Sequence, residues 1–310
     1  MHKADYQLII IGGGPAGLTA GLYASRDRLK TLLLEKGAIG GQVNITDWVD
    51  NYPGFVEGAT GFELMEKMSA HAARFGLETR FANVTSLDLK ENIKSVHLEN
   101  GETLTSQAVI ICTGGSPGRL GIKGEVELTG KGVSYCATCD GPFYREEEIA
   151  VVGGGNTAIQ EAVHLTKFAS KVTVIHRRNQ LRATQIVQEK ALANDKIHFI
   201  LDASVTAIEG GDNGVERLYI EHNNGTRSTL DVTGIFILIG VIPNNEMLPL
   251  DDLEVDKYGF VKTDPEMRTS LPGVFAAGDI RSKSFRQIVT AAGEGATAEL
   301  SVEHYLGGES

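Results

Sequence analysis

The sequence has few cysteines and no long hydrophobic run, and both shortages exclude whole classes of protein. Three cysteines among 310 residues are too few for a disulfide-stapled scaffold. No apolar stretch approaches the ~20 residues that a membrane-spanning helix needs. The first apolar run, Leu8–Ile11, is also too short for the core of a signal peptide. We therefore expect a cytoplasmic protein, and in that reducing compartment a close cysteine pair is more often catalytic or metal-binding than structural.

An excess of positive charge is also absent. The formal net charge is −11, which argues against nucleic acid or an anionic membrane as the main partner. The 310 residues exceed the size of most single hydrophobic cores, so we expect two domains. Glycine, by contrast, is abundant with 37 residues. Its clusters follow predicted strands, which indicates tight turns where the backbone approaches a ligand.

The first glycine cluster lies between a predicted strand, at residues 7–11, and a helical pattern at residues 18–30. A second predicted strand then ends on Glu35. This order is typical of a dinucleotide-binding βαβ unit, in which free N–H groups at the helix N-terminus bind the pyrophosphate. The glycines of the G-x-G-x-x-G pattern are Gly12, Gly14 and Gly17.

The same pattern returns later in the chain. A predicted strand at residues 149–152 precedes the second glycine loop, and a helical pattern and the strand "KVTVI" follow it. A single glycine motif is weak evidence, but two copies in the same context favour two genuine nucleotide sites. We therefore predict an α/β fold with two Rossmann-like dinucleotide-binding domains. The second motif, G-x-G-x-x-A, consists of Gly153, Gly155 and Ala158.

The two copies differ in the residue that ends the second strand. A carboxylate such as Glu35 accepts hydrogen bonds from ribose hydroxyls and repels a 2′-phosphate, which favours FAD or NAD. The second copy has a basic cluster there, and guanidinium groups favour the 2′-phosphate of NADPH. A basic cluster is usually only a solvated surface, but its position in a nucleotide unit favours a phosphate site. This cluster consists of His176, Arg177, Arg178 and Arg182.

A third glycine-containing stretch precedes the last predicted helix. Gly278 and Asp279 directly follow a predicted strand. An acid in that place could bind the ribityl hydroxyls of a flavin, and the helix start near residues 286–288 could point its amides at the flavin ring. The alternative is that Asp279 only caps the helix.

The pair Cys136 and Cys139 could be half of a zinc site, a structural disulfide or a redox centre. Four thiolates are not available, and no two histidines have the paired spacing of a zinc site, so we expect no metal. A disulfide that closes such a short loop stabilises a fold little. Redox exchange is therefore the favoured interpretation. The third cysteine, Cys112, ends an apolar run and is expected to pack as a small hydrophobic residue.

Several motifs occur together in one order along nearly the whole chain. They are "IGGGPAG" at 11–17, "GGQ" at 40–42, "NYPG" at 51–54, "CATCDG" at 136–141, "GGGNTA" at 153–158, "HRR" at 176–178, "RA" at 182–183, "FAAGD" at 275–279 and "RQ" at 286–287. In these motifs the chain closely resembles bacterial-type, low-molecular-weight thioredoxin reductases. The resemblance implies FAD, NADPH, a homodimer, and thioredoxin as the oxidised substrate.

The resemblance also implies a domain order and residue roles. The FAD domain would take residues 1–115 and 245–310, and an inserted NADPH domain, residues 116–244, would carry the cysteines. Cys139 would lie nearest the flavin, Cys136 would attack the partner's disulfide, and Asp140 would move the proton. The expected FAD residues are Gly12, Gly14, Ala16, Gly17, Glu35, Gly41, Gln42, Asn51, Gly278, Asp279, Arg286, Gln287 and Ile288. The expected NADPH residues are Gly153, Gly155, Asn156, Thr157, Ala158, His176, Arg177, Arg178 and Arg182.

Such an enzyme must bring its disulfide, its nicotinamide and its protein substrate into place in turn. We therefore expect the inserted domain to rotate on its two linkers.

A related flavoprotein that takes electrons from ferredoxin, or that reduces another small disulfide protein, is the alternative. A nucleotide-binding redox sensor without turnover is a further one. The "GGSPG" stretch at 114–118 fits a hydrolase elbow, but Pro117 lacks the N–H that an oxyanion hole needs.

Overall fold

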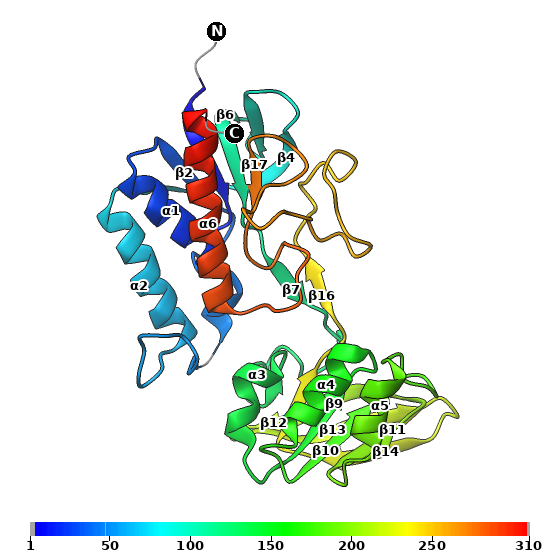
Figure 1. Ribbon diagram of the computed structural model, residues 1–310. Coiled ribbons are helices and arrows are strands. Elements are labelled where there is room, and N and C mark those ends of the chain that lie inside the picture. Colours follow the sequence, from blue (N-terminus) through cyan, green and yellow to red (C-terminus); the bar gives the residue numbers. More distant parts are fainter. Residues whose placement is uncertain (1–3, 47, 309–310) are drawn as a thin grey trace. The chain divides into compact units, whose positions relative to one another are not determined.

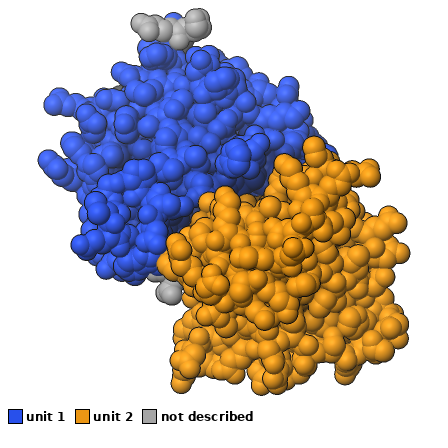
Figure 2. Space-filling model, turned by 60° about the horizontal axis from the view of Figure 1, so that its bottom comes forward, with its two compact units in different colours: residues 1–116, 242–310 blue, residues 117–241 orange. Residues whose placement is uncertain are grey.

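A computed structural model describes residues 4–46 and 48–308 of the chain. The chain divides into two compact units (Figure 2). Unit 1 consists of residues 1–116 and 242–310, and unit 2 consists of residues 117–241. Unit 2 therefore interrupts the sequence of unit 1.

Unit 1 is built on a seven-stranded sheet with the order β3-β2-β1-β6-β5-β4, and β17 also pairs with β6. The strands β1, β2, β3, β6 and β17 are joined in parallel, as the βαβ pattern requires, while β4 and β5 are antiparallel. The elements are β1 (Tyr6–Ile11), α1 (Pro15–Arg26), β2 (Thr31–Glu35), the 3₁₀ helix η1 (Gly41–Ile45), α2 (Gly61–Arg74), β3 (Glu78–Phe81), β4 (Val84–Asp88), β5 (Lys94–Leu98), β6 (Thr103–Ile111), β7 (Gly115–Pro117), β16 (Val241–Pro243), β17 (Val274–Ala276) and α6 (Ile288–Gly307).

Both faces of the parallel part of this sheet are buried. Leu8 and Ile10 of β1 face one core cluster, which they share with residues of α1, α2 and α6 (Figure 1). Ile9 and Ile11 face a second cluster, which is completed by β4, β5 and residues 247–280. Burial on both sides explains why β1 reads as a continuous apolar run rather than an alternating one.

The interior of the helical layer contains one carboxyl group. Glu299 of α6 has no exposed surface, and neither carboxylate oxygen has a hydrogen-bond partner among the described residues. Burial raises the pKa of Glu299 to about 8, and the negative charges of Asp27 and Glu303 add to the shift. This group is therefore largely protonated in the folded protein near neutral pH.

Unit 2 contains a five-stranded sheet with the order β11-β10-β9-β15-β8, all parallel, and a three-stranded antiparallel sheet, β12-β13-β14. The elements are β8 (Val133–Ser134), α3 (Ala137–Asp140), the 3₁₀ helix η2 (Gly141–Tyr144), β9 (Glu148–Val152), α4 (Asn156–Leu165), β10 (Lys171–Ile175), α5 (Gln185–Leu192), β11 (Ile197–Ile200), β12 (Ala203–Gly211), β13 (Gly214–His222), β14 (Arg227–Asp231) and β15 (Gly234–Ile237).

The parallel sheet of unit 2 also has two covered faces. Ile149 and Val151 of β9 pack in a cluster with residues of α4 and α5. Ala150 and Val152 pack in another cluster with residues of the three-stranded sheet. The structure thus confirms the predicted α/β class, with one Rossmann-like βαβ unit in each compact unit.

Most local predictions were confirmed, and one helix was predicted too long. The predicted strands at residues 7–11, 149–152 and 171–175 correspond to β1, β9 and β10. Helix α1 ends at Arg26 rather than near residue 30. The reason is that Arg28 adopts a left-handed conformation with φ +60°, which a helix cannot continue through.

Candidate functional site

The first glycine loop is shaped by close backbone contacts. Gly12 has φ +108°, and a Cβ there would lie 2.3 Å from the carbonyl oxygen of Cys112. A Cβ on Gly17 would lie 1.9 Å from the carbonyl oxygen of Gly12. A Cβ on Gly14 would meet nothing within 4 Å, so this glycine borders open space. Gly14 also precedes α1 without a side-chain cap, which leaves the N–H groups of the first turn available to an anion.

Glu35 is fixed beside this loop. Its carboxylate accepts hydrogen bonds from the backbone N–H groups of Gly13 (2.7 Å) and Gly37 (2.8 Å). A small cavity of about 50 Å³ adjoins it at the carboxyl ends of the parallel strands, where open α/β sheets bind nucleotides. Besides Gly12 and Glu35, its lining includes Lys36, Asn83, Thr113 and Asn244.

The predicted flavin segments of unit 1 come together around Ala16. A Cβ on Gly278 would lie 3.0 Å from the Cβ of Ala16, and one on Gly295 of α6 would lie 2.1 Å from its carbonyl oxygen. The loop after β1, the turn after β17 and helix α6 therefore meet at one point. On the other side of the site, the amide of Asn51 donates a hydrogen bond to Oε1 of Gln287 (3.0 Å).

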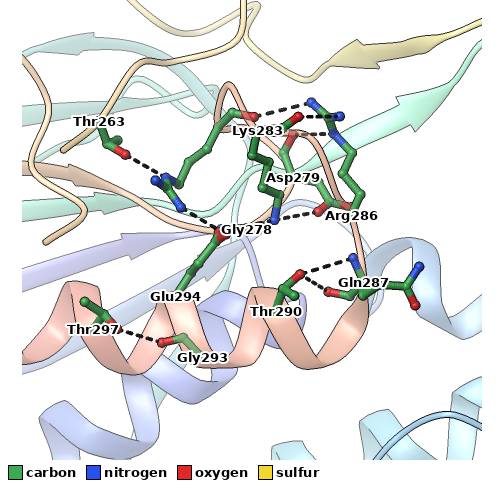
Figure 3. Close-up of polar contacts among 11 residues, drawn as sticks. Thr263, Gly278, Asp279, Lys283, Arg286, Gln287, Thr290, Gly293, Glu294 and Thr297 are labelled. Atoms are coloured by element: carbon green, nitrogen blue, oxygen red, sulfur yellow. Dashed lines mark hydrogen bonds and ion pairs between the residues drawn. The ribbon is translucent and has the colours of Figure 1, made fainter. Parts of the chain in front are cut away.

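An ion cluster supports the turn at residues 278–286 (Figure 3). Glu294 of α6 accepts a hydrogen bond from the N–H of Gly278 (2.7 Å) and pairs with Arg281 (2.9 Å) and Lys283 (3.2 Å). The amine of Lys283 also lies 3.1 Å from Oδ1 of Asp279. The backbone and the carboxylate of this turn are thus held from the helix side.

Arg286 serves the same turn. Its guanidinium donates to the carbonyl oxygens of Asp279, Arg281 and Lys283 (3.3–3.4 Å; Figure 3). The guanidinium also stacks over the ring of Phe260, at 4.2 Å from its centre. Burial lowers the pKa of Arg286 from its usual value. A direct contact of Arg286 with FAD stays a prediction, since its described contacts are with the protein.

The residues of unit 1 fit a flavin dinucleotide. Two buried oxygens, Thr113 Oγ1 and Asn44 Oδ1, lack a hydrogen-bond partner within residues 4–46 and 48–308. Buried polar atoms are normally paired, so a ligand with donor and acceptor groups suits this place. Gly41 and Gln42 lie on the same 3₁₀ helix, η1, as Asn44. A Cβ on Gly41 would meet nothing within 4 Å, so this glycine borders open space. Ile288 begins α6, directly after Gln287.

The second glycine loop has the same form with a different neighbour. A Cβ on Gly154 would lie 2.5 Å from the imidazole ring of His176, so the ring packs directly against the loop. Gly155 precedes α4, again without a side-chain cap and with nothing within 4 Å of a Cβ. Thr157 and Ala158 lie in the first turn of α4, and Asn156 Oδ1 accepts the N–H of Thr184 (2.7 Å).

The basic cluster has a fixed backbone and unengaged side chains. The carbonyl oxygen of Gly154 accepts the N–H groups of Arg182 (2.6 Å) and Ala183 (3.0 Å). Arg177, Arg178 and Arg182 are exposed, and no guanidinium among them bonds or pairs with a described residue. His176 is buried, and burial together with the three arginine charges lowers its pKa. Three free guanidiniums beside a glycine loop fit a nucleotide that carries an additional phosphate.

The cysteine pair lies at the start of α3 in unit 2, as a disulfide between Cys136 and Cys139. Cys136 precedes this short helix, and its sulfur accepts the backbone N–H of Cys139 (3.2 Å). A sulfur at that position is favoured as a thiolate once the disulfide opens. Cys112 is buried in the core of unit 1, where burial raises the pKa of its thiol, so it packs as predicted and is inert.

A serine that the sequence did not single out connects Asp140 to the cysteines. Ser134 on β8 is buried, and its hydroxyl donates to Oδ2 of Asp140 (2.5 Å). The hydroxyl oxygen of Ser134 also accepts the backbone N–H of Cys136 (3.1 Å). Tyr144 lies nearby, and burial plus the charge of Asp140 raises its pKa to about 12. The acid therefore has a defined place beside the disulfide.

Sequence reasoning missed five residues of these sites: Asn44, Thr113, Ser134, Asn244 and Glu294. Thr113 could have been found from its position, because it closely follows β6, the strand next to β1. Glu294 and Asn244 act through contacts between segments far apart in the sequence, which leave no spacing signal. Ser134 lies only six residues before Asp140, but it belongs to none of the motifs. Within the described part of the chain, no helix is both long and apolar enough to cross a bilayer, and no group of three potential metal ligands occurs.

Comparison with known proteins agrees with this description. The sequence profile of the pyridine nucleotide-disulphide oxidoreductase family matches residues 6–295. A thioredoxin reductase of Peptoclostridium litorale is 45% identical over 309 residues, with 97% of each chain covered. One of Listeria monocytogenes is 44% identical over 302 residues, covering 97% of this chain and 94% of the relative. The crystal structure of thioredoxin reductase from Streptococcus pyogenes superposes with a TM-score of 0.93 at 45% identity, covering 98% of each chain.

Proposed function

This chain belongs to the pyridine nucleotide-disulphide oxidoreductase family, and on that basis we propose that it is an NADPH-dependent thioredoxin reductase. The cofactors are FAD and NADPH, and the substrate is the disulfide of thioredoxin. The observation that carries the proposal is the Cys136–Cys139 disulfide in the same unit as a glycine loop flanked by free arginines. A disulfide and a 2′-phosphate site together are what an NADPH-dependent disulfide reductase needs.

We assign FAD to unit 1. The glycine loop at 12–17 would receive the pyrophosphate, Glu35 the ribose hydroxyls, and the turn at Asp279 the ribityl chain. Asn44 and Thr113 would offer their unpaired oxygens to the cofactor. Bound FAD supplies the two-electron chemistry that links a nicotinamide to a disulfide.

We assign NADPH and the thiol chemistry to unit 2. The loop at 153–158 would hold the pyrophosphate, and Arg177, Arg178 and Arg182 would bind the 2′-phosphate. In the dithiol form, Cys136 is the sulfur favoured as a thiolate, because it accepts the N–H of Cys139. It attacks one sulfur of the thioredoxin disulfide, and the other sulfur leaves as a thiolate.

The second half of the exchange restores the Cys136–Cys139 disulfide. Cys139, as a thiolate, attacks Cys136 in the mixed disulfide and releases the second thioredoxin sulfur. Each released sulfur takes up one proton, so thioredoxin leaves as a dithiol and the enzyme is oxidised by two electrons. Asp140, held by Ser134 next to Cys136, is the group that moves protons between these thiols and water.

One experiment tests this assignment. The purified protein is mixed with NADPH and oxidised thioredoxin, and Cys136→Ser serves as the variant. We expect the variant to lose thioredoxin reduction by at least about a thousandfold, because it lacks the attacking thiolate, while NADPH still bleaches the flavin absorbance. Substantial thioredoxin reduction by the variant, or a protein that binds no flavin, would refute the proposal.

Three further features belong to the proposal. A homodimer follows from the resemblance, and light scattering of the holoenzyme tests it. A cytoplasmic location suits a chain with a free buried cysteine and a reducible disulfide.

The flavin and cysteine sites belong to different units, so we expect unit 2 to rotate on its two connections during turnover. A crosslink between the units that preserved full turnover would contradict the rotation.

A further inference from the structure

The region at residues 201–235 carries no recognisable motif, yet it contacts the backbone of all three residues of the "HRR" triplet. The carbonyl oxygen of His176 accepts the N–H of Ala203 (3.1 Å). The carbonyl oxygen of Arg178 accepts the N–H of Asp202 (3.2 Å). The carbonyl oxygen of Arg177 accepts the side-chain amide of Asn223 (3.2 Å). The triplet is thus anchored, residue by residue, on the start of β12 and on the turn between β13 and β14.

Asn223 is the centre of this anchor. Its backbone N–H donates to the carbonyl oxygen of Asp202 (2.7 Å), and its side-chain amide donates to Oδ1 of Asp202 (3.1 Å) as well as to Arg177. The two N–H bonds of one amide group can serve both acceptors. One side chain therefore ties the turn, Asp202 and the basic triplet together.

Asp202 needs such support because its backbone is strained. It has φ +52°, in the left-handed region that non-glycine residues enter only at an energetic cost. In this conformation its N–H points to the carbonyl oxygen of Arg178. The side-chain amide of Asn223 holds the carboxylate of Asp202 and the carbonyl oxygen of Arg177. Loss of this amide would release both groups, whereas the bond from the backbone N–H of residue 223 to Asp202 would remain.

The anchor matters because the arginine side chains themselves are unrestrained. Their guanidiniums are exposed and bond no described residue, whereas their backbone is fixed on one side by Gly154 and on the other by Asp202 and Asn223. A site whose backbone is already ordered binds its ligand at a lower entropic cost. The 2′-phosphate, which the arginines would contact, is therefore the ligand group whose binding the ordered backbone favours.

We propose that Asn223, acting through Asp202, is a positioning residue that sets the preference of this protein for a nucleotide with a 2′-phosphate. The inference rests on the proposed assignment of NADPH to unit 2. It adds to that assignment a specificity determinant that does not touch the nucleotide. The three-stranded sheet thereby acquires a role, as the support on which the phosphate-binding arginines are mounted.

The test compares two ligands that differ only in the 2′-phosphate, adenosine 2′,5′-bisphosphate and adenosine 5′-monophosphate. Their dissociation constants are measured by calorimetry on the oxidised holoenzyme and on its Asn223→Ala variant. We expect the constant for the bisphosphate to rise about threefold to tenfold, as the loss of one or two hydrogen bonds allows. The constant for the monophosphate should change by less than about twofold. The ratio of the KM values for NADPH and NADH should shift in the same direction.

The chain offers a matched control in the neighbouring asparagine. The side chain of Asn224 bonds only within the turn, to the N–H and hydroxyl of Thr226. Asn224→Ala should therefore leave the preference unchanged. As a second variant, Asp202→Gly tolerates the left-handed backbone and removes only the side-chain bond to Asn223. It should lower the preference less than Asn223→Ala does, and it remains informative if that variant folds poorly.

The outcomes separate this inference from the proposed function. A wild-type protein that binds both ligands equally would overturn the NADPH assignment and this inference with it. A wild-type preference that both Asn223→Ala and Asp202→Gly retain in full would overturn this inference alone. Equal weakening of both ligands in Asn223→Ala would show a merely structural role and would also overturn it.

Discussion

The two glycine loops place different side chains at the same point of the same backbone. In unit 1, Gly13 donates its N–H to the carboxylate of Glu35. In unit 2, the corresponding Gly154 packs against the ring of His176, and arginines follow. Each second strand ends beside the middle glycine of its own loop. The residue at this strand end therefore sets the charge that a bound ribose meets, while the loop serves any pyrophosphate.

The loops also differ in how closely the helix approaches the strand. In unit 1, a Cβ on Gly17 would lie 1.9 Å from the carbonyl oxygen of Gly12. In unit 2 the same position is Ala158, whose methyl group would lie 2.6 Å from a Cβ on Gly153. The first loop thus has no room for a methyl group where the second loop contains one. Four predictions test how far the two units differ.

The largest effect is expected at Gly17. Gly17→Ala forces a methyl group into a backbone oxygen, so we expect a loss of more than about 4 kcal/mol in stability and a protein purified without flavin. The mirror change in unit 2, Ala158→Gly, should cost only about 1–2 kcal/mol, from helix propensity and one buried methyl group. Thermal unfolding and the flavin absorbance spectrum measure both. A yellow, stable Gly17→Ala protein would contradict this account of the loop.

The next effect concerns the free energy of unfolding, which should depend on pH in opposite directions in the two units. Burial raises the pKa of Glu299 in unit 1 from its usual 4.5 to about 8, so the free energy of unfolding falls as the pH rises through this range. Burial and arginine charges lower the pKa of His176 in unit 2, so its contribution is lost as the pH falls below 6.5.

Glu299→Gln removes the first of these responses. We expect it to stabilise the protein by about 2–4 kcal/mol at pH 8 and by less than about 1 kcal/mol at pH 5, because only the charged form is penalised. The melting temperature from pH 5 to pH 8 is the measurement. Glu66→Gln, at an exposed position of α2, is the control and should change neither value by much. The same pH dependence in Glu299→Gln and the wild type would argue against a buried charge.

A third, smaller effect separates the nucleotides of the two units. Arg178→Ala should raise the KM for NADPH about ten- to fiftyfold, because a charge-assisted bond to the 2′-phosphate is lost. The KM for NADH and the flavin content of unit 1 should stay within about twofold. Arg227→Ala removes another exposed arginine of unit 2, on β14, and serves as the control. An equal rise of both KM values would show that Arg178 does not distinguish the two nucleotides.

The smallest effect is expected in the thiol chemistry, which unit 2 carries and unit 1 lacks. Ser134→Ala leaves Asp140 and the N–H of Cys136 without a shared hydroxyl. Thioredoxin reduction should slow about threefold to tenfold, whereas flavin reduction by NADPH should keep its rate. Stopped-flow measurement of each half-reaction decides this, with the exposed Ser204→Ala as control. If both half-reactions slowed alike, Ser134 would be a packing residue only.

The sequence alone predicted the parts of these sites that depend on local order along the chain. Both glycine loops, the residues that end the second strands and the close cysteine pair are readable because the chemistry requires a fixed spacing. The α/β class was confirmed for the same reason, since each βαβ unit is a contiguous segment. The roles of individual cofactor-binding residues stay predictions.

The supporting residues could not be predicted in this way. Glu294 holds Gly278 from a helix that begins ten residues later, and Asn223 reaches Arg177 across 46 residues. Such bonds depend on how sheets and helices pack. Many sequences are compatible with the same packing, so no fixed residue pattern identifies these bonds. The end of α1 was missed because the left-handed turn at Arg28 is not a glycine.

The two segments that connect the units pair with each other, and this pairing bears on how such a chain can be assembled. They pair as β7 and β16, and the N–H of Gly118 donates to the carbonyl oxygen of Gly240 (2.8 Å). The polypeptide thus leaves unit 1 and returns to it at one place. A gene segment that encodes unit 2 can be inserted or exchanged at this one place, because the strands of unit 1 keep their order and their connections. The two short strands thus mark the place at which such a segment can be inserted or replaced.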